Sequence, residues 1–111
     1  MPAALNNFKT TLADVTTTTA NVYTPPLGYA TVVLMAQVSN TGANVIQISA
    51  GVYRSASYTA LINDASVPPN DAISVLTGRL ILQYGDVLQF SSSDNSSGQL
   101  VLSYLETLVT V

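Results

Sequence analysis

The segment Ala30-Thr31-Val32-Val33-Leu34-Met35-Ala36-Gln37-Val38-Ser39 decides the fold class. Its even-numbered positions are all apolar, whereas its odd-numbered positions mix apolar and polar residues. Because successive side chains of a β-strand point to opposite sides, this period of two predicts a strand whose even-numbered side chains face a core. The following segment repeats the pattern on Ile46, Ile48, Ala50 and Val52. Asn40-Thr41-Gly42 lies between the two segments and contains residues that tolerate a positive φ, so we predict a β-hairpin there.

Further strands are predicted on both sides of this pair. Each is a short apolar or β-branched run bounded by Gly, Pro, Asn or Asp, and no run has the 3.6-residue period of a helix. The predicted strands cover residues 8–13, 16–23, 58–62, 72–76, 79–83, 87–91 and 99–107. Seven to nine short, mostly antiparallel strands predict an all-β fold, a single-domain β-sandwich of Ig-like or jelly-roll style over residues 1–111. Residues 1–15 are expected to form an N-terminal arm or an edge strand, and a small closed barrel is the alternative fold.

The composition predicts a protein that works within an assembly. Hydrophobic residues make up 48% of the chain, which is ample for a core, and only 8% of residues are charged. Globular proteins usually carry about 25% charged residues. The polar surface must therefore come from thirteen Thr, twelve Ser, eight Asn and five Gln. Such a surface gives little charge repulsion to keep copies apart.

The charge pattern argues against nucleic acid and membrane partners. The net charge is −3, and the basic residues Lys9, Arg54 and Arg79 are widely spaced, so no basic patch for phosphates is expected. No basic amphipathic stretch is present, and the longest apolar run, Val32–Ala36, is far too short to span a bilayer. The first residues resemble no secretory signal, so we expect synthesis in the cytoplasm.

No catalytic, cofactor or metal site is predicted. The chain contains no His and no Cys, which removes the commonest general base, the commonest metal ligand and the best nucleophile. Most of the six carboxylates lie in or beside predicted turns, where Asp side chains bind nearby backbone amides. No Asn/Asp turn has the spacing of a calcium loop. Three tyrosines could stack on sugar rings, which leaves a carbohydrate-binding module as an alternative: Tyr23, Tyr53 and Tyr58.

The last predicted strand is apolar on both sides. Leu100, Leu102 and Tyr104 share one side, and Val101 and Leu105 share the other. Either a loop or the N-terminal segment covers this second side, or it is a subunit interface. The scarcity of charge favours the interface, which is predicted to include Val33, Met35, Val101 and Leu105.

The order of several segments resembles small virion proteins of tailed bacteriophages, over about Phe8 to Glu106. The segments are Val22-Tyr23-Thr24-Pro25-Pro26, Ala30-Thr31-Val32-Val33-Leu34, Asn40-Thr41-Gly42, Ile62–Pro69, Leu82–Leu88 and Leu100–Glu106. The resemblance implies a β-sandwich on the virion that acts as a capsid decoration (cement) protein, or alternatively as a neck, tail or fibre component. It implies no catalytic residues. The implied partners are further copies of the chain, as a trimer or dimer, and virion proteins such as the major capsid protein.

Overall fold

The computed structural model describes residues 6–109, which form nine β-strands. Their bounds are β1 (Asn6–Val15), β2 (Ala20–Tyr23), β3 (Tyr29–Asn40), β4 (Ile46–Arg54), β5 (Ser57–Val67), β6 (Ala72–Ser74), β7 (Leu80–Leu82), β8 (Val87–Ser92) and β9 (Gly98–Leu108). No helix in this range is long and apolar enough to cross a membrane. Residues 1–15 were predicted to form an N-terminal arm or an edge strand. Residues 6–15 form β1 at the edge of a sheet, and residues 1–5 lie outside the described part.

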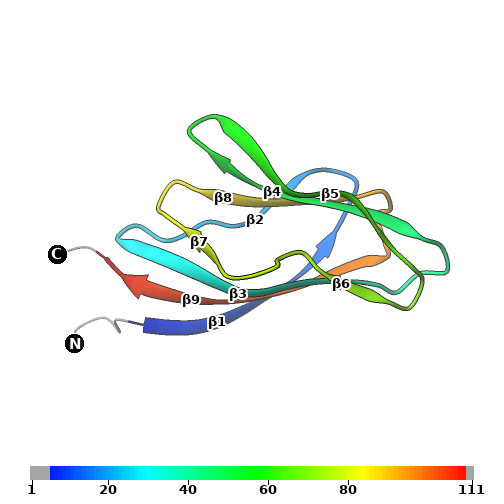
Figure 1. Ribbon diagram of the computed structural model, residues 1–111, viewed down its shortest axis with the longest axis horizontal. Coiled ribbons are helices and arrows are strands. Elements are labelled where there is room, and N and C mark those ends of the chain that lie inside the picture. Colours follow the sequence, from blue (N-terminus) through cyan, green and yellow to red (C-terminus); the bar gives the residue numbers. More distant parts are fainter. Residues whose placement is uncertain (1–5, 110–111) are drawn as a thin grey trace.

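The strands form two antiparallel sheets that pack face to face (Figure 1). One sheet has the order β1-β9-β3-β6, with β7 also paired to β3, and the other has the order β2-β8-β4-β5. β1 pairs with β9, β2 with β8, β3 with β6 and β7, and β4 with β5. This nested pairing over two sheets is the jelly-roll arrangement. The predicted all-β sandwich is confirmed in its jelly-roll form, and the alternative of a small closed barrel is wrong.

The core fills the space between the two sheets. On β9, the predicted alternation is confirmed, because Leu100, Leu102 and Tyr104 all point inward and are at most 6% exposed. Burial of an aliphatic or aromatic side chain of this size contributes about 1.5–3 kcal/mol to folding. The largest fully buried apolar side chains come from both sheets: Phe90, Ile48, Leu82, Leu88, Leu100 and Leu102.

The alternation of β3 reverses at a bulge. The pairing of β3 with β9 shifts register between Val33 and Met35. Before the bulge, the odd-numbered Thr31 and Val33 are buried, and after it the even-numbered Ala36 is buried. A bulge adds one residue to one strand and so moves the inward positions from odd to even numbers. The predictions that Leu34 faces the core and that Val33 lies on the other side are therefore wrong, since Leu34 is 40% exposed and Val33 is 0% exposed.

Asn40-Thr41-Gly42 does not close a hairpin, because β3 and β4 lie in different sheets. The buried Asn40 side chain organises the crossing between the sheets. Its Nδ2 donates to the carbonyl oxygens of Asn44 and Val67, at 2.7 and 2.9 Å, and its Oδ1 accepts from the N–H of Gly42 at 2.9 Å. The hairpin prediction is wrong because residues that suit a tight turn also satisfy the backbone of a buried crossing.

Asn63-Asp64, the Asn/Asp pair that bounds the predicted strand 58–62, lies inside β5 rather than in a turn at its end. Asp64 has a φ of 51°, and its N–H donates to Ser49 Oγ at 3.0 Å. Beside it, the pairing of β4 with β5 shifts register between Ile48 and Ala50. A left-handed residue within a paired strand is typical of a bulge, so this signal marks an irregular strand and not a turn.

Gly51 of β4 is a position where any side chain would meet a neighbouring strand. A Cβ at Gly51 would overlap the backbone oxygen of Thr59 and the ring of Tyr58. We expect Gly51→Ala to lower the free energy of unfolding by about 1–3 kcal/mol, because β5 must move away from β4. Chemical denaturation measures this loss. Gly78→Ala is the control, because a Cβ there meets nothing within 4 Å. Equal losses in both variants would contradict the expectation.

Candidate assembly surfaces

The outer face of the five-stranded sheet carries a row of apolar side chains that crosses four strands. Phe8 of β1 lies opposite Leu105 of β9, and Leu105 lies opposite Val32 of β3. Val32 in turn lies opposite Ile81 of β7. Directly opposite residues point to the same face, so the four side chains are neighbours. Phe8 is 77% and Ile81 is 60% exposed, which leaves both ends of the row open to solvent.

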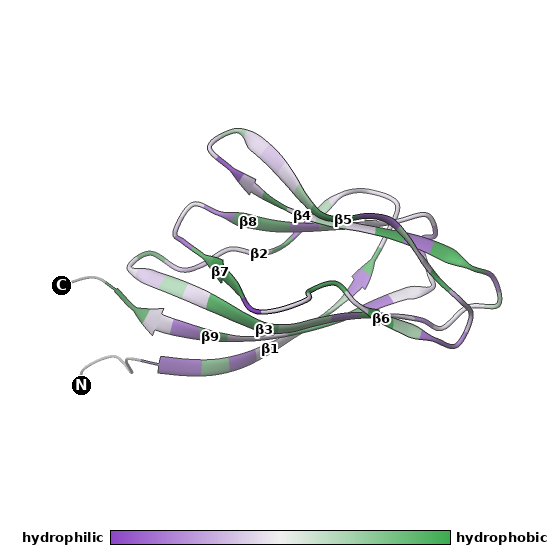
Figure 2. Ribbon diagram, in the orientation of Figure 1, coloured by the Kyte–Doolittle hydropathy of each residue, from purple (hydrophilic) through white to green (hydrophobic). Residues whose placement is uncertain are grey.

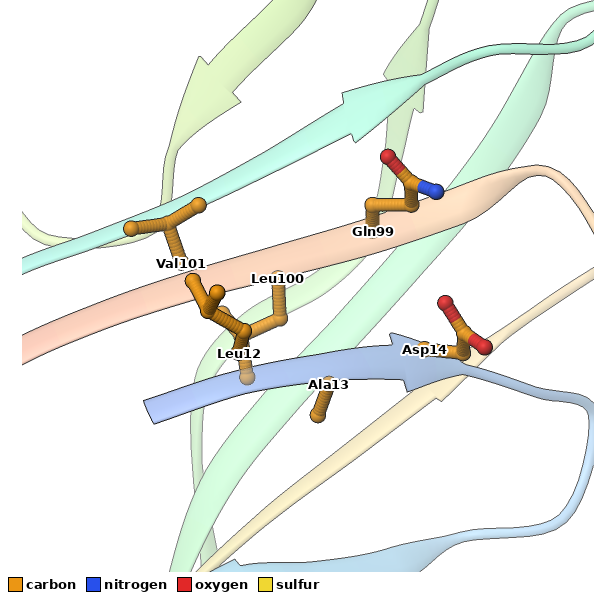
Figure 3. Close-up of a pocket in the computed structure, with 6 residues that line it drawn as sticks. All are labelled: Leu12, Ala13, Asp14, Gln99, Leu100 and Val101. Carbon is orange, nitrogen blue, oxygen red and sulfur yellow. The ribbon is translucent and has the colours of Figure 1, made fainter. Parts of the chain in front are cut away.

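A second apolar pair lies farther along the same face. Leu12 of β1 is 73% exposed and lies opposite Val101 of β9. Figure 3 shows these two side chains next to each other, with Asp14 and Gln99 beyond them. Leu34 and Met35 of β3, which lie at the bulge, add two further apolar side chains to this face. We call this set the apolar face: Phe8, Leu12, Val32, Leu34, Met35, Ile81, Val101 and Leu105.

The outer face of the four-stranded sheet is polar over most of its length, and its exposed aromatic residues, Tyr53 and Tyr58, lie at the end that forms the β4–β5 hairpin. Ser49 of β4 lies opposite Ser91 of β8, and Gln89 Nε2 donates to Asn21 Oδ1 at 2.8 Å. An antiparallel sheet that faces water normally carries polar side chains on that side, as this one does. The outer face of the five-stranded sheet departs from this pattern, and Figure 2 shows that even the edge strand β1 carries hydrophobic residues, drawn as green bands, between hydrophilic ones. We call the contrasting set the polar face: Asn21, Gln47, Ser49, Ser66, Gln89 and Ser91.

The structure places three of the four predicted interface residues on the apolar face: Met35, Val101 and Leu105. Each is half-buried by its neighbours within the sheet. Val33 is wrongly assigned, because the bulge turns it into the core, where it is 0% exposed. Contact of the other three residues with a partner remains a prediction.

The sequence reasoning missed the most exposed members of the apolar face. Phe8 and Leu12 are four residues apart on one strand, so they share a face, and this spacing was the available signal. It does not tell which face is the outer one. Ile81 gave no signal, because β7 has only three residues and its pairing with β3 is not visible in the sequence.

A smaller apolar cluster lies at one end of the sandwich. Leu27 is 78%, Tyr84 62% and Val109 59% exposed, and all three line the same groove with Tyr29. The N–H of Val109 donates to the carbonyl oxygen of Gly28 at 2.9 Å. This hydrogen bond holds Val109 beside the loop between β2 and β3. We call Leu27, Tyr84 and Val109 the end patch.

Glu106 is a buried carboxylate that joins the two sheets. It is 3% exposed, accepts a hydrogen bond from the Tyr23 hydroxyl at 2.6 Å, and pairs with Lys9 Nζ at 2.9 Å. Since the single Tyr23 proton goes to Glu106, the Thr31 hydroxyl donates to Tyr23, at 2.7 Å. Burial and the carboxylate raise the pKa of Tyr23, and Glu106 raises the pKa of Lys9. The network ties β1, β9, β3 and β2 together. The alternation of β9 was a signal that Glu106 points inward with Tyr104, but its partners are distant in the chain and were not predicted.

Asp86 is the second buried carboxylate, and it fixes the loop before β8. It is 2% exposed, binds the Arg54 guanidinium through both oxygens, and accepts from the N–H of Gln83 at 2.8 Å. The Arg54 guanidinium and the Gln83 amide hold the pKa of Asp86 below its usual value, against the opposing effect of burial. Thr24 Oγ1 donates to the Asp86 carbonyl oxygen at 2.7 Å, so the same residue also holds the segment before the end patch.

Two further acidic residues, Asp71 and Asp94, have the turn role that was predicted for them. Asp71 Oδ1 accepts from the N–H of Ala72 at 2.8 Å, and Asp94 Oδ1 accepts from the N–H of Ser96 at 2.7 Å. This bonding to Ser96 lowers the pKa of Asp94. Among residues 6–109, no three His, Cys, Asp or Glu side chains gather closely enough to hold a metal ion.

The three candidate sugar-binding tyrosines do not form one platform. The ring of Tyr23 packs against Tyr104 between the sheets, with ring centroids 4.3 Å apart. Tyr53 and Tyr58 lie opposite each other at the β4–β5 hairpin, 40% and 45% exposed, and the Tyr58 ring covers Gly51. Tyr23 is half-buried and serves the inter-sheet network, and only Tyr53 and Tyr58 of the three are exposed.

Comparisons with known proteins bear on the fold. No protein-family model and no curated protein matches the chain. Among solved structures, the chain is similar to a subunit described under "Bacillus endospore appendages form a novel family of disulfide-linked pili". The alignment covers 96% of this chain and 88% of that one, with 10% sequence identity and a TM-score of 0.58. The likeness is one of fold. At that identity it carries no residue of the pilus subunit over to this chain.

Proposed function

We propose that this chain is a non-enzymatic structural subunit that attaches to a larger particle through its apolar face. The carrying observation is the difference between the two outer faces of one sandwich. The polar face suits water, whereas the apolar face leaves Phe8, Leu12 and Ile81 at least 60% exposed. Burial of apolar surface contributes about 25 cal/mol per Å², so a partner that covers this face gains affinity without matched charges.

The particle we propose is the virion of a tailed bacteriophage, with the chain as a capsid decoration protein on the major capsid protein. The resemblance of the sequence to small virion proteins supports this assignment. The jelly roll also supports it, because this fold recurs in viral capsid proteins. The end patch offers a second apolar contact, which a subunit needs when it bridges neighbouring molecules.

The structural neighbour supports a role in an assembly, but the two proteins differ in their cysteines. That protein belongs to endospore appendages that are described as disulfide-linked pili. The present sequence has no Cys, so these 111 residues cannot form the disulfide links of those pili. An apolar face provides a non-covalent contact.

A neck, tail or fibre position in the same virion is the alternative. Symmetry separates the two positions, because a shell displays a decoration protein over its whole surface, whereas the particle axis holds few copies. Quantitative mass spectrometry of purified particles, with a density map of the intact particle, gives the copy number and the location. Few copies on the axis would replace the decoration assignment by the alternative.

Introducing charges on the apolar face is expected to release the protein from its particle. We expect the double variant Val101→Lys, Leu105→Glu to lower the bound fraction at least about tenfold, because the contact would bury charges without prepared partners. Binding is measured by pelleting particles with added protein and reading the bound fraction from a gel. The unmodified protein is expected to stay bound from about 0.05 to 1 M NaCl, because screening has few charges to act on.

The matched control carries the same charges on the polar face. Gln47→Lys, Ser66→Glu changes two exposed residues that lie opposite each other on the other sheet. This control should bind like the unmodified protein, and circular dichroism should show that both variants are folded. Equal release of both variants, or release of the unmodified protein at moderate salt, would refute attachment through the apolar face.

A further inference from the structure

The sheet edges of this sandwich differ in how well they are protected against pairing with another chain. β2 has four residues and a register shift, and β6 and β7 have three residues each. β5 is long, but its pairing is interrupted beside Asp64, which has a positive φ. Short strands and bulges are the usual devices that prevent edge-to-edge association. Among the described residues, these devices protect every edge except that of β1.

β1 is a long and regular edge strand. All ten of its residues pair with β9 in one continuous register, from Asn6 opposite Thr107 to Val15 opposite Gly98. The strand contains no Pro and no residue with a positive φ. Its other side pairs with no strand in the described part of the chain, and Figure 1 shows it at the margin of the sandwich. Alternate N–H and C=O groups of β1 are therefore available to a further strand.

The one Lys on this strand does not guard the edge. An edge Lys commonly discourages pairing because its charge must stay in water. Here Lys9 turns toward the inner side of the sheet, where its Nζ lies 2.9 Å from Glu106 Oε1. The side chains that β1 presents on the outer side are apolar or neutral near its middle, namely Phe8, Thr10 and Leu12.

These three residues are self-complementary about Thr10. When two copies of β1 pair antiparallel with Thr10 opposite Thr10, Phe8 of each copy lies opposite Leu12 of the other. Both side chains lie on the outer face, and their exposure of 77% and 73% would fall on pairing. The register matches even-numbered with even-numbered residues. In an edge strand, every second residue directs its N–H and C=O groups to the free edge. In this register, the residues that do so in one copy therefore lie opposite the corresponding residues of the second copy.

Neighbouring registers with the same face alignment are less favourable. A two-fold axis at Lys9 places the two Lys9 side chains opposite each other, which is a like-charge pair. An axis at Thr11 places Phe8 opposite Asp14, which puts an apolar ring against a carboxylate. With the axis at Thr10, Asp14 lies opposite Asn6 and Lys9 opposite Thr11, so no like charges meet.

We infer that a second copy of this chain binds at the edge of β1, in an antiparallel pairing with a two-fold axis at Thr10. The contact is isologous, so it closes at a dimer and consumes the only unprotected edge of the described residues. The two five-stranded sheets become one continuous sheet, and both apolar faces lie on the same side of it. If the proposed function holds, the dimer presents two linked apolar faces to the particle, which raises its avidity.

Cysteine crosslinking tests this register cleanly, because the chain has no Cys of its own. Directly opposite residues of antiparallel strands have Cα atoms about 4.5–5.5 Å apart, which lies within the range of a disulfide. We expect Thr10→Cys to form a crosslinked dimer in high yield under mild oxidation. The control Thr59→Cys, an exposed position on the edge strand β5, should stay at background. Phe8→Cys and Leu12→Cys should crosslink with each other when mixed, and not each alone.

Sedimentation of the unmodified chain gives an independent measurement. We expect a reversible dimer, and we expect Thr10→Lys to raise its dissociation constant about fivefold to tenfold, because two Lys side chains would meet at the axis. A monomer at about 0.1 mM, a concentration at which a contact of even weak affinity is populated, would overturn the inference. Equal crosslinking of Thr10→Cys and Thr59→Cys would also overturn it.

The outcome is distinguishable from that of the proposed function. Particle binding is tested on Val101 and Leu105 of β9, and dimerisation is tested on β1 in the absence of particles. A dimer with the Thr10 register that fails to pellet with particles refutes the proposed function alone. A monomer that pellets refutes the dimer alone.

Discussion

Replacing Glu106 with Ala is expected to lower the free energy of unfolding by about 2–4 kcal/mol. The carboxylate is 3% exposed and accepts the Tyr23 hydroxyl proton at 2.6 Å. Without it, the Tyr23 hydroxyl loses its charged acceptor, the site loses the Lys9 ion pair, and a cavity opens between the sheets. Chemical denaturation measures the loss.

A double-mutant cycle assigns this loss to the contact between the two sheets. Tyr23→Phe removes only the hydroxyl, and Glu106→Ala removes its acceptor. If the hydrogen bond is the main term, the effects of these two substitutions are not additive, with a coupling energy of about 0.5–3 kcal/mol. Thr107→Ala, the next residue on the opposite face of β9, serves as the control. Additive effects, or an equal loss in the control, would contradict an inter-sheet role of Glu106.

The strands were predictable from the sequence because alternation is a local property. β9 shows this best, since every second residue from Leu100 to Tyr104 is apolar and all of these side chains are buried. The connections were not predictable by the same means. Asn40-Thr41-Gly42 suits a tight turn, but whether the next strand joins the same sheet depends on pairing with distant strands. The single bulge at Leu34 then reversed the assignment of half of β3.

The candidate surface was predictable only where a strand is regular. Val101 and Leu105 were assigned correctly to the outer face because β9 alternates without interruption. Val33 was assigned wrongly because a bulge is a property of two paired strands and leaves no mark on one of them. The partners of the two buried carboxylates were not predictable for a related reason. Alternation on β9 indicates that Glu106 points inward with Tyr104, but its partner Tyr23, like the Arg54 partner of Asp86, is distant in the chain.

Asp86 gives the second large expected effect, which depends on pH. Its folded pKa is held low by Arg54 and by the Gln83 amide. The folded state therefore binds this proton more weakly than the unfolded state, whose Asp pKa is about 3.9. The stability that ionised Asp86 contributes is fully present above that value and is lost as the pH falls through the lower folded pKa.

Asp86→Asn should therefore lower the free energy of unfolding at pH 7 by about 1.5–3 kcal/mol, because both Asp86 oxygens accept hydrogen bonds and the amide would place an N–H donor against one of these donors. It should also flatten the decline in stability between about pH 5 and pH 2, because the titrating group is gone. Denaturant unfolding of the two proteins across this range measures both effects. Asp14→Asn is the control, because Asp14 is exposed and makes no ion pair in the described part of the chain.

Asp86 also holds the loop that carries Tyr84 and, through Thr24, the segment that leads to Leu27. Acid should therefore loosen the end patch before it unfolds the sheets, and amide hydrogen exchange at Tyr84 should rise first. Parallel stability curves for Asp86→Asn and the unmodified protein through the acid range would show that this ion pair has no such role.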